Sequence, residues 1–409
     1  MSQDVYILGG GQSDFAVNWS KQGNTLESLI EQGVREAGQA ASINLGDVDS
    51  IHVGNFIAEL NADQGHLGGL VAEVLPELRG KPIGRHEAAC ASGSLAILGA
   101  RSDLLAGVAD LACVIGIEWM RNLPGRQAAI NLNCAAWHAK ENKPDRLVWP
   151  HLFSSLVDEY TERYGLDRRH LEAITEKNLR NAKANPNAQT RSWQWQPQHF
   201  KTSSPENPAI DGHIHRYDCA QITDGTAVIF LANRQKAAEY AKNRGLNLDQ
   251  IPRIKGYGHT TARISFAGKC QDAPREGYLF PHMAKAARDA FQRAEVSGWQ
   301  ELDGFEVHDC FNITEYSIIE HLGITSPGEA FKAIEEGWTS KGGRIPINPS
   351  GGLMGLGHPV GATGVRMALD AAKQVQGQAQ DMQITGAKNF GTLNIGGSAT
   401  TVVSFVIGI

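Results

Sequence analysis

Cysteine is scarce and unpaired in this sequence. The 409 residues include six cysteines, and no two of them have the C-x-x-C spacing of a zinc or redox site. Scattered thiols of this kind are typical of reduced intracellular proteins rather than of disulfide-linked secreted ones. We therefore expect a cytoplasmic protein whose thiols are free.

Long apolar runs and a strong net charge are also missing. No stretch approaches the roughly 18 uncharged apolar residues that a membrane span needs, so we expect no membrane association. The net charge of −6 argues against nucleic-acid binding. The charge is unevenly distributed, because residues 121–200 contain 12 Lys and Arg against 8 Asp and Glu. Such a basic segment suits a polyanionic ligand, such as a phosphorylated cofactor, or a plain solvated surface.

Two glycine-rich stretches lack the residue that would make them nucleotide-binding loops. Gly9–Gly11 follows a strand-like segment, but the third glycine of a G-x-G-x-x-G fingerprint is absent, so we expect a simple turn there. The run at 348–364 reads NPSGGLMGLGHPVGATG and lacks the lysine of a phosphate-binding loop. Within it, Pro359 favours an extended backbone at His358. A histidine in such a loop can accept a proton or stabilise an oxyanion.

Strand-like and helix-like segments alternate in both halves of the chain, which predicts an α/β fold with a mainly parallel sheet. The halves repeat a similar order of elements, so we expect a duplicated core. Strands are predicted at Val5–Gly9, Asp49–Phe56, Leu111–Ile117, Gln221–Phe230, Pro252–Tyr257, Gly304–His308, Gln383–Phe390 and Ala399–Ile407. Helices are predicted from a cap at Asn24 through Ala41 and at Leu95–Gly107, Ser154–Tyr164, Arg168–Ala184, Pro281–Ala294, Ile313–Leu322 and Gly361–Val375.

Cys90 is the first candidate for chemistry. It stands at a predicted strand-to-helix turn, and the positive end of a helix dipole lowers a thiol pKa and favours the nucleophilic thiolate. The small residues that follow, Ala91 to Gly93, allow a substrate carbonyl to approach the backbone. The alternative is a buried structural cysteine, which is common in proteins.

Three other stretches offer reactive or turn-forming groups. His308 and Cys310 follow a predicted strand and are close enough in sequence to reach one cavity. The segment 389–398, NFGTLNIGGS, is predicted to be a glycine-rich turn between strands. The cluster at His213, His215 and Cys219 is the only other metal-like spacing, and an ordinary loop is the more frequent origin of such a pattern. We expect no metal site.

Together these runs resemble the thiolase superfamily, and most specifically the sterol carrier protein-type thiolases. The segment GHPVGATG at 357–364, the Cys-x-Ser-Gly at 90–93 and the His-Asp-Cys-Phe at 308–311 carry the resemblance. Most thiolases have Asn-Glu-Ala-Phe at the last of these places. Ordinary thiolases also carry a second catalytic cysteine where this chain has Asn394, predicted here to form a turn.

The resemblance implies an acyltransferase that makes and cleaves 3-oxoacyl-CoA by a reversible Claisen reaction. Cys90 would form the acyl-enzyme, and Cys310 would take over the acid–base role of the missing cysteine. The backbone of Cys90 and Gly396 and the side chains of His308 and His358 would stabilise the oxyanions, with His358 also accepting the thiol proton. Coenzyme A and acyl-CoA would be substrates in lipid metabolism, with no permanently bound cofactor.

The resemblance also implies a domain organisation and partners. The N-terminal thiolase half would span residues 1–120 and 218–250, with a CoA-covering loop insertion at 121–217 between them. The C-terminal half would span 251–409. A homodimer or homotetramer would be expected, and a partner subunit in a CoA-channelling complex is possible.

Two other functions use some of the same residues. A ketoacyl synthase also uses one cysteine and two histidines, but decarboxylates a malonyl thioester. A non-catalytic scaffold that channels CoA intermediates would tolerate the Asn394 departure. Activity with malonyl-CoA alone would indicate the first, and absence of an acetyl adduct on Cys90 would indicate the second.

Overall fold

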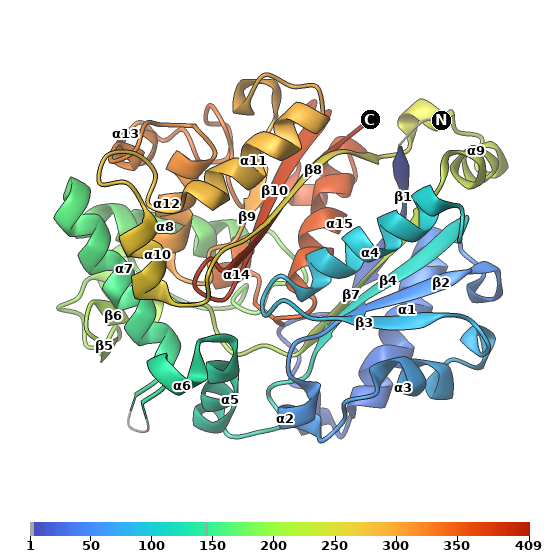
Figure 1. Cartoon of the computed structure of the whole chain (residues 1–409), viewed down its shortest axis with the longest axis horizontal. Coiled ribbons are helices and arrows are strands. Elements are labelled where there is room, and N and C mark those ends of the chain that lie inside the picture. The colour runs from blue at the N-terminus through green and yellow to red at the C-terminus, as the bar shows by residue number, and fades with distance from the viewer. Residues whose placement is uncertain (1–3, 144–145) are drawn as a thin grey trace.

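The computed structural model describes residues 4–143 and 146–409, so the parts of the predicted segments at 1–3 and 144–145 lie outside the described residues. A sheet of nine strands crosses the molecule in the order β3-β2-β4-β7-β1-β8-β11-β10-β9 (Figure 1). The first five are β3 (Ile83–His86), β2 (Ser50–Gly54), β4 (Leu111–Glu118), β7 (Gly225–Ala232) and β1 (Val5–Gln12). The other four are β8 (Arg253–Thr261), β11 (Thr401–Gly408), β10 (Asn389–Gly396) and β9 (Phe305–Val307).

The order of the strands reveals a duplication. In the first half β2 pairs with β4 in parallel, and β4, β7 and β1 then pair antiparallel. The second half repeats this pattern with β9, β10, β11 and β8. Only Val5 and Tyr6 of β1 pair with β8, so this short contact joins the halves. The predicted α/β core of two halves is confirmed.

The prediction of a mainly parallel sheet is wrong. Of the eight pairings between strands described in this sheet, five are antiparallel and three parallel. A parallel pair needs a crossover of a dozen or more residues, whereas antiparallel strands can be joined by a tight turn. Only residues 397–400 connect β10 to β11, so this pair is necessarily antiparallel.

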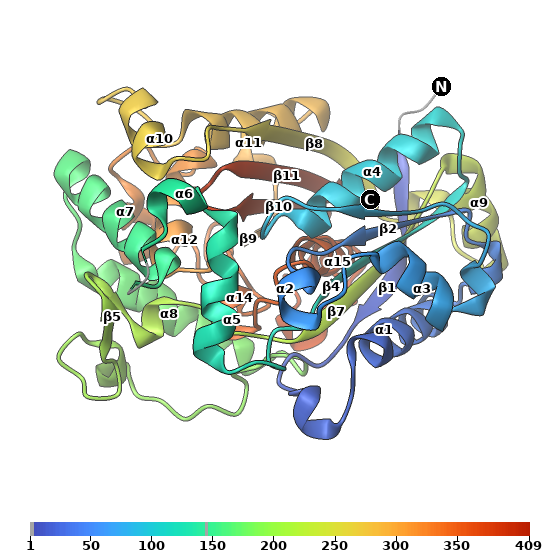
Figure 2. The same ribbon diagram turned by 60° about the horizontal axis from the view of Figure 1, so that its bottom comes forward.

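Two helices at equivalent positions of the halves pack together in the middle of the molecule. They are α4 (Ser92–Ala106), before β4, and α15 (Thr363–Val375), before β10. α15 lies near the centre of the molecule (Figure 2), where it contacts α4 and strands of both halves. Nearly all of its side chains are buried. Because the reactive residues predicted at 90 and 358 directly precede these helices, the duplication directs both toward the same central region.

Outer helices cover the sheet, and glycine permits their close packing. α11 (Pro281–Arg293) lies on β8, where a Cβ at Gly258 would stand 1.8 Å from the carbonyl oxygen of Ala286. α1 (Leu26–Ala41) lies on β1 in the first half. Further helices in these halves are α2 (Ala58–Ala62), α3 (Leu67–Val74), α9 (Arg234–Asn243) and α10 (Phe266–Asp272).

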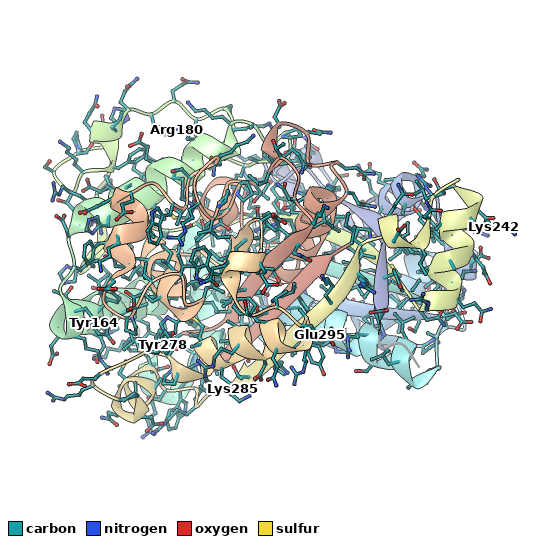
Figure 3. The ribbon with its side chains drawn as sticks, turned by 90° about the horizontal axis from the view of Figure 1, so that it is seen from above. Tyr164, Arg180, Lys242, Tyr278, Lys285 and Glu295 are labelled. Carbon is teal, nitrogen blue, oxygen red and sulfur yellow. The ribbon has the colours of Figure 1, made fainter. Side chains whose placement is uncertain are left out.

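The segment between β4 and β7 packs on the C-terminal half. It contains α5 (Gly125–Asn131), α6 (His138–Glu141), α7 (Val148–Tyr164), α8 (Arg168–Ala182) and the hairpin β5 (Ala209–Asp211) and β6 (Ile214–His215). α8 contacts α12 (Asn312–His321), α13 (Ala330–Glu335) and α14 (Gly352–Gly355). Figure 3 shows this segment, marked by Tyr164 and Arg180, at the end of the molecule opposite to Lys242 of α9.

One predicted glycine turn is wrong, and the other is confirmed only at its last two residues. Gly9–Gly11 continues β1 and pairs with β7, where a Cβ on Gly10 would lie 2.0 Å from the carbonyl oxygen of Val228. Segment 389–396 is strand β10, so of the predicted turn at 389–398 only Gly397 and Ser398 lie in a turn. The strand predicted at Gln383–Phe390 begins only at Asn389. In both places glycine lies within a strand and lets a neighbouring group come close. Because glycine has a weak strand propensity, the sequence does not reveal these segments as strands.

The predicted helices are present with shifted ends. The cap of α1 is Thr25, whose hydroxyl accepts from the backbone N–H of Ser28, rather than Asn24. α7 begins six residues before the predicted Ser154, and α8 ends at Ala182. Among the described residues, no helix combines the length and the apolar character needed to cross a bilayer.

Candidate active site

Cys90 lies on a tight turn between β3 and α4. Ala89, just before it, has a left-handed backbone with φ of +51°, a conformation that costs energy for a residue with a Cβ. Ser92 stabilises the turn, because its hydroxyl accepts from the Ala88 N–H at 3.0 Å and donates to the Ala89 carbonyl at 2.6 Å. The turn therefore holds the Cys90 side chain in a defined position.

Glycine brings the histidine loop against this turn. A Cβ on Gly93 would lie 2.6 Å from the carbonyl oxygen of Gly361, in the loop that follows His358. The Cα of Gly93 itself would stand 2.6 Å from a Cβ on Gly54, at the end of β2. Gly93 is thus required for the two halves to meet here, and Gly54 for α4 to pack against β2.

His358 is fixed at its backbone and at its ring. Its N–H donates to the hydroxyl of Thr223 at 3.0 Å, and its Nδ1 lies 2.7 Å from the hydroxyl of Thr363. Burial lowers the pKa of His358 to about 3, and the positive charge of Arg366 acts in the same direction. The imidazole is therefore neutral at physiological pH.

His308 follows β9 and is fully buried. Its Nδ1 lies 2.9 Å from the amide nitrogen of Asn394, and its Nε2 has no hydrogen-bond partner among the described residues. The rings of His308 and His358 are nearly perpendicular, with centroids 5.1 Å apart. Burial, His358 and Arg366 hold the pKa of His308 well below its ordinary value.

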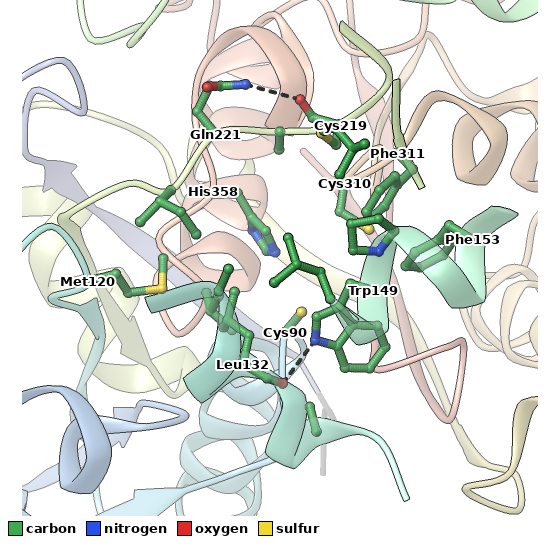
Figure 4. Close-up of a pocket in the computed structure, with 18 of the residues that line it drawn as sticks. Cys90, Met120, Leu132, Trp149, Phe153, Cys219, Gln221, Cys310, Phe311 and His358 are labelled. Atoms are coloured by element: carbon green, nitrogen blue, oxygen red, sulfur yellow. Dashed lines mark hydrogen bonds between the residues drawn. The ribbon is translucent and has the colours of Figure 1, made fainter. Parts of the chain in front are cut away.

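The structure brings these predicted residues to one place. The Cys90 sulfur and one ring nitrogen each of His308 and His358 lie within 4.8 Å of one another. Cys310 lines the same cavity as Cys90 and His358 (Figure 4). Groups separated by more than two hundred residues in the sequence thus face a common space.

The thiol pKa differs from the sequence prediction. A helix dipole was expected to lower the pKa of Cys90, but burial raises it to about 12. Cys90 precedes the first residue of α4 by two positions, so the dipole acts on it less than burial does. Burial, with Cys90 and Asp309 nearby, also raises the pKa of Cys310 well above its ordinary value. Both thiols are protonated at neutral pH.

The turn after β10 supplies a backbone donor next to Cys90. The N–H of Gly397 forms a hydrogen bond with the Cys90 sulfur, and Gly397 lines the cavity. A Cβ on Gly396 would lie 2.1 Å from the Ala88 carbonyl, so this glycine lets the turn reach the cysteine. The predicted oxyanion role of the Gly396 N–H stays a prediction.

The cavity has a volume of about 290 Å³, and its walls are mainly apolar. The segment between β4 and β7 contributes Leu132, Trp149 and Phe153, and the indole N–H of Trp149 donates to the Leu132 carbonyl at 2.9 Å (Figure 4). The other large apolar lining residues include Phe56, Met120, Ile222, Phe311 and Val360. Such a cavity suits an apolar group next to the reactive thiol.

Sequence reasoning missed two buried ionisable residues near the reactive side chains, Glu118 near Cys90 and Arg366 near His358. Glu118 is fully buried and accepts four N–H bonds, one of them from Gly361 in the histidine loop. Burial raises its pKa to about 7. Arg366 forms an ion pair with Glu306 at 2.6 Å. The available signals were an acidic residue directly after the apolar strand 111–117 and a lone arginine within the apolar helix 363–375.

The metal-like cluster of the sequence does not assemble. His213 pairs with Asp158 and His215 with Asp218. Within the part of the chain that the structure describes, the one group with three converging metal-ligand atoms is Cys90, His308 and His358. A thiolate and two imidazoles are ligands that a soft ion such as Zn²⁺ accepts.

The fold and the site define a duplicated α/β protein that brings one cysteine and two neutral histidines together. Models of the thiolase family match most of the chain, the N-terminal domain at residues 5–235 and the C-terminal domain-like model at 271–409. The chain belongs to the thiolase family.

Full-length relatives and solved structures agree with this assignment. Acetyl-CoA acetyltransferases of Methanothermobacter thermautotrophicus and Methanocaldococcus jannaschii are each 31% identical, over 98% and 99% of both chains respectively. Human sterol carrier protein 2 is 26% identical over 99% of this chain and 72% of its own. Human mitochondrial 3-ketoacyl-CoA thiolase has the same fold, with a TM-score of 0.70 at 16% identity over 99% of this chain and 98% of its own. The Ltp2-ChsH2(DUF35) aldolase does too, with a TM-score of 0.78 at 19% identity and the same coverage.

Proposed function

We propose that this protein is an acyl-CoA acyltransferase that makes and cleaves 3-oxoacyl-CoA through an acyl-cysteine. The observation that carries the proposal is the convergence of the Cys90 sulfur with ring nitrogens of two neutral histidines, next to an apolar cavity that Cys90 and His358 line. The names of the archaeal relatives, acetyl-CoA acetyltransferase, support the same reaction class.

Acylation begins with proton transfer from Cys90 to His358. The cysteine sulfur attacks the thioester carbonyl of an acyl-CoA, and its proton passes to Nε2 of His358. The tetrahedral oxyanion is stabilised by backbone N–H groups at Cys90 and at the turn after β10. Coenzyme A then leaves as a thiol with the proton from His358, and the acyl group stays on Cys90. Because burial disfavours a free thiolate, this transfer to His358 is essential.

Condensation uses the second cysteine. Cys310 first gives its thiol proton to the neutral imidazole of His358. The resulting thiolate removes a proton from the α-carbon of a second acyl-CoA, and the enolate oxygen is stabilised by N–H groups of His308 and of the protonated His358. The enolate carbon attacks the acyl-Cys90 carbonyl, the carbon–sulfur bond breaks, and Cys90 leaves as a thiolate. The proton on His358 then passes to the Cys90 thiolate, and the α-proton stays on Cys310, so both thiols return to their protonated starting state. Thiolysis is the reverse sequence.

The segment 121–217 is proposed to cover the CoA nucleotide, with its pantetheine arm reaching Cys90. Its basic character suits a phosphorylated ligand, and its side chains already form one wall of the cavity. Coenzyme A is then a substrate, and no resident cofactor takes part in the steps above. The domain limits 1–120, 121–217, 218–250 and 251–409 form part of this proposal.

Assembly and location complete the proposal. We expect a homodimer or homotetramer in the cytoplasm, where the six free cysteines suit a reducing compartment. The structural neighbour named Ltp2-ChsH2(DUF35) aldolase joins a protein of this fold to a second subunit. It supports a partner subunit for this chain as well, including one in a CoA-channelling complex.

The direct test is to look for the covalent intermediate. Incubation with acetyl-CoA, followed by peptide mass spectrometry, is expected to show an acetyl group on Cys90, and the Cys90→Ala variant is expected to show none. Thiolysis of acetoacetyl-CoA by the wild type should accompany the adduct. If neither adduct nor thiolysis is observed, the protein is a scaffold. If malonyl-CoA reacts and acetyl-CoA does not, it is a decarboxylating ketoacyl synthase.

A further inference from the structure

The two histidines of the site are hydrogen-bonded at Nδ1 to partners of opposite character. The hydroxyl of Thr363 donates its proton to the Pro359 carbonyl at 3.1 Å, so toward His358 it is an acceptor. The Nδ1 of His358 therefore carries the ring proton. Its Nε2 is left as a lone pair, which is the form that a proton acceptor needs.

The partner of His308 is an amide that is itself held in one orientation. The hydroxyl of Ser94 donates to Oδ1 of Asn394 at 2.8 Å, which leaves the amide nitrogen of Asn394 facing His308 Nδ1 at 2.9 Å. An amide nitrogen donates and does not accept. The Nδ1 of His308 must therefore be the acceptor, and the ring proton is on Nε2.

We propose that Asn394 is a positioning residue that fixes His308 in the Nε2–H tautomer, with Ser94 fixing Asn394 in turn. The role in catalysis rests on the function proposed above, because a donor at Nε2 is what an enolate or thioester oxygen requires. Asn394 stands where ordinary thiolases have a cysteine, and this proposal gives the asparagine at that position a role, the orientation of the His308 ring proton.

The surrounding packing is built for this chain of hydrogen bonds. Ser94, Asn394 and His308 are each at most 1% exposed, so water does not compete for these groups. They come from α4, β10 and the end of β9, and the N–H of His308 donates to the carbonyl of Leu393, next to Asn394. This backbone bond sets the register that brings the amide to the ring.

Glycine keeps the space for the chain open. A Cβ on Gly364, in α15, would lie 2.3 Å from the Ser94 hydroxyl and 2.8 Å from Asn394 Oδ1. The contact between the two central helices is therefore shaped around these polar atoms.

The same tautomer opposes metal capture at the site. A metal ion needs a lone pair from each ligand, and the converging atoms of Cys90, His308 and His358 would otherwise suit Zn²⁺. With Nδ1 accepting from Asn394 and a proton on Nε2, neither ring nitrogen of His308 has a free lone pair for a metal ion. Zinc affinity therefore reports the tautomer independently of acyl transfer.

Asn394→Asp tests the assignment with almost no change in shape. The carboxylate can accept from both Ser94 and His308 Nδ1, so it should transfer the ring proton to Nδ1 and leave a lone pair at Nε2. In wild type, ¹⁵N NMR of histidine-labelled protein should show a protonated Nε2 for His308, assigned with a His308→Gln variant. In Asn394→Asp the two nitrogen signals should exchange character.

Calorimetric titration with Zn²⁺ gives the second readout. Asn394→Asp should bind Zn²⁺ at least about tenfold more tightly than wild type, and adding Cys90→Ser should remove the gain. Its acyl-transfer rate should fall about 10²-fold, as for other lost oxyanion donors. Ser94→Ala removes the hydroxyl that holds the Asn394 amide in one orientation, so the NMR signals of His308 should indicate a mixture of both tautomers. This variant replaces Asn394→Asp as the test if the latter folds poorly.

Asn207→Asp is the matched control. Asn207 is also fully buried and donates to a carbonyl, that of Phe200 at 2.8 Å, but in the segment between β4 and β7. This variant should leave the His308 tautomer and zinc affinity unchanged. A protonated Nδ1 on His308 in wild type, or an unchanged tautomer and zinc affinity in Asn394→Asp, would overturn the proposal. Absence of the acetyl adduct in wild type would refute the proposed function. The NMR signals and the zinc affinity would still test the tautomer of His308, because neither depends on acyl transfer.

Discussion

Cys90 is a neutral thiol in the folded protein, because burial raises its pKa to about 12. A neutral thiol reacts slowly with alkylating reagents, since the thiolate is the nucleophile. The chemistry therefore depends on the neighbouring His358, which accepts the proton only while the sulfur attacks.

Alkylation of Cys90 should therefore lack the usual plateau near pH 9. We expect the rate with iodoacetamide, followed by peptide mass spectrometry, to increase about tenfold per pH unit from pH 7 to at least 10.5. In the urea-unfolded chain the same peptide should level off near the ordinary thiol pKa. A plateau below pH 8 in the native protein would contradict the burial argument.

Cys310 differs from Cys90 in its expected contribution. Cys310→Ala should retain the acetyl adduct on Cys90, because acylation needs only Cys90, His358 and the oxyanion donors. Condensation and thiolysis should fall by at least 10²-fold, since no group then removes the α-proton. Mass spectrometry measures the first step and a coupled CoA assay the second. Equal loss of both steps would show that Cys310 supports the site rather than exchanging the proton.

At the scale of the elements, the ends of helices were the least certain part of the sequence interpretation. The spacing of apolar residues predicts a helix ending at Ala41, and the structure confirms it. Asn24 and Thr25 are both good caps by residue type. The choice between them depends on which side chain reaches an N–H of the first turn, and in the structure the Thr25 hydroxyl does so.

Substitution of the two candidate caps should separate them. Thr25→Ala is expected to lower the free energy of unfolding by about 1 kcal/mol, because the N–H of Ser28 loses its acceptor. Asn24→Ala should change it by less than about 0.5 kcal/mol, as for an ordinary surface position. Urea denaturation followed by circular dichroism measures both. A larger loss of stability in Asn24→Ala than in Thr25→Ala would place the cap at Asn24.

At the scale of the whole molecule, buried thiols couple stability to alkaline pH. Burial raises the pKa of Cys270 to about 12 and that of the fully buried Cys113 further still. Above the ordinary thiol pKa of 9.0, the unfolded chain releases protons that the folded protein retains. Raising the pH therefore favours the unfolded state.

The contribution of these buried thiols to the free energy of unfolding should thus be constant below pH 8 and decrease above pH 9. Each such thiol contributes a slope of about 1.4 kcal/mol per pH unit until its folded pKa is reached. Between pH 9.5 and 11 the free energy of unfolding of Cys113→Ala should decrease with pH less steeply than that of wild type, by about this slope. This should hold even if the variant is less stable at pH 7. Urea denaturation at each pH checks this, and parallel curves would contradict it.

Several features followed from the local sequence alone. Alternating apolar segments predicted an α/β protein of two similar halves, because burial of a strand or a helix face imposes a local pattern. The runs around Cys90 and His358 marked candidate residues, since a reactive side chain among glycines and other small residues has little structural use. His308 was marked by its place after a predicted strand and close to Cys310. Both kinds of signal lie within short stretches of chain.

Only the tertiary structure decided how these stretches meet. Glycines at 9–11 and 391–396 read as turns because their purpose, close contact with a distant backbone or ring, is not local. The pKa of Cys90 likewise depends on burial by both halves, which outweighs the nearby helix dipole. The tautomer inferred for His308 requires Ser94 from one half and Asn394 from the other. Electrostatics and hydrogen bonding in this site arise from groups hundreds of residues apart, so no short stretch of sequence contains them.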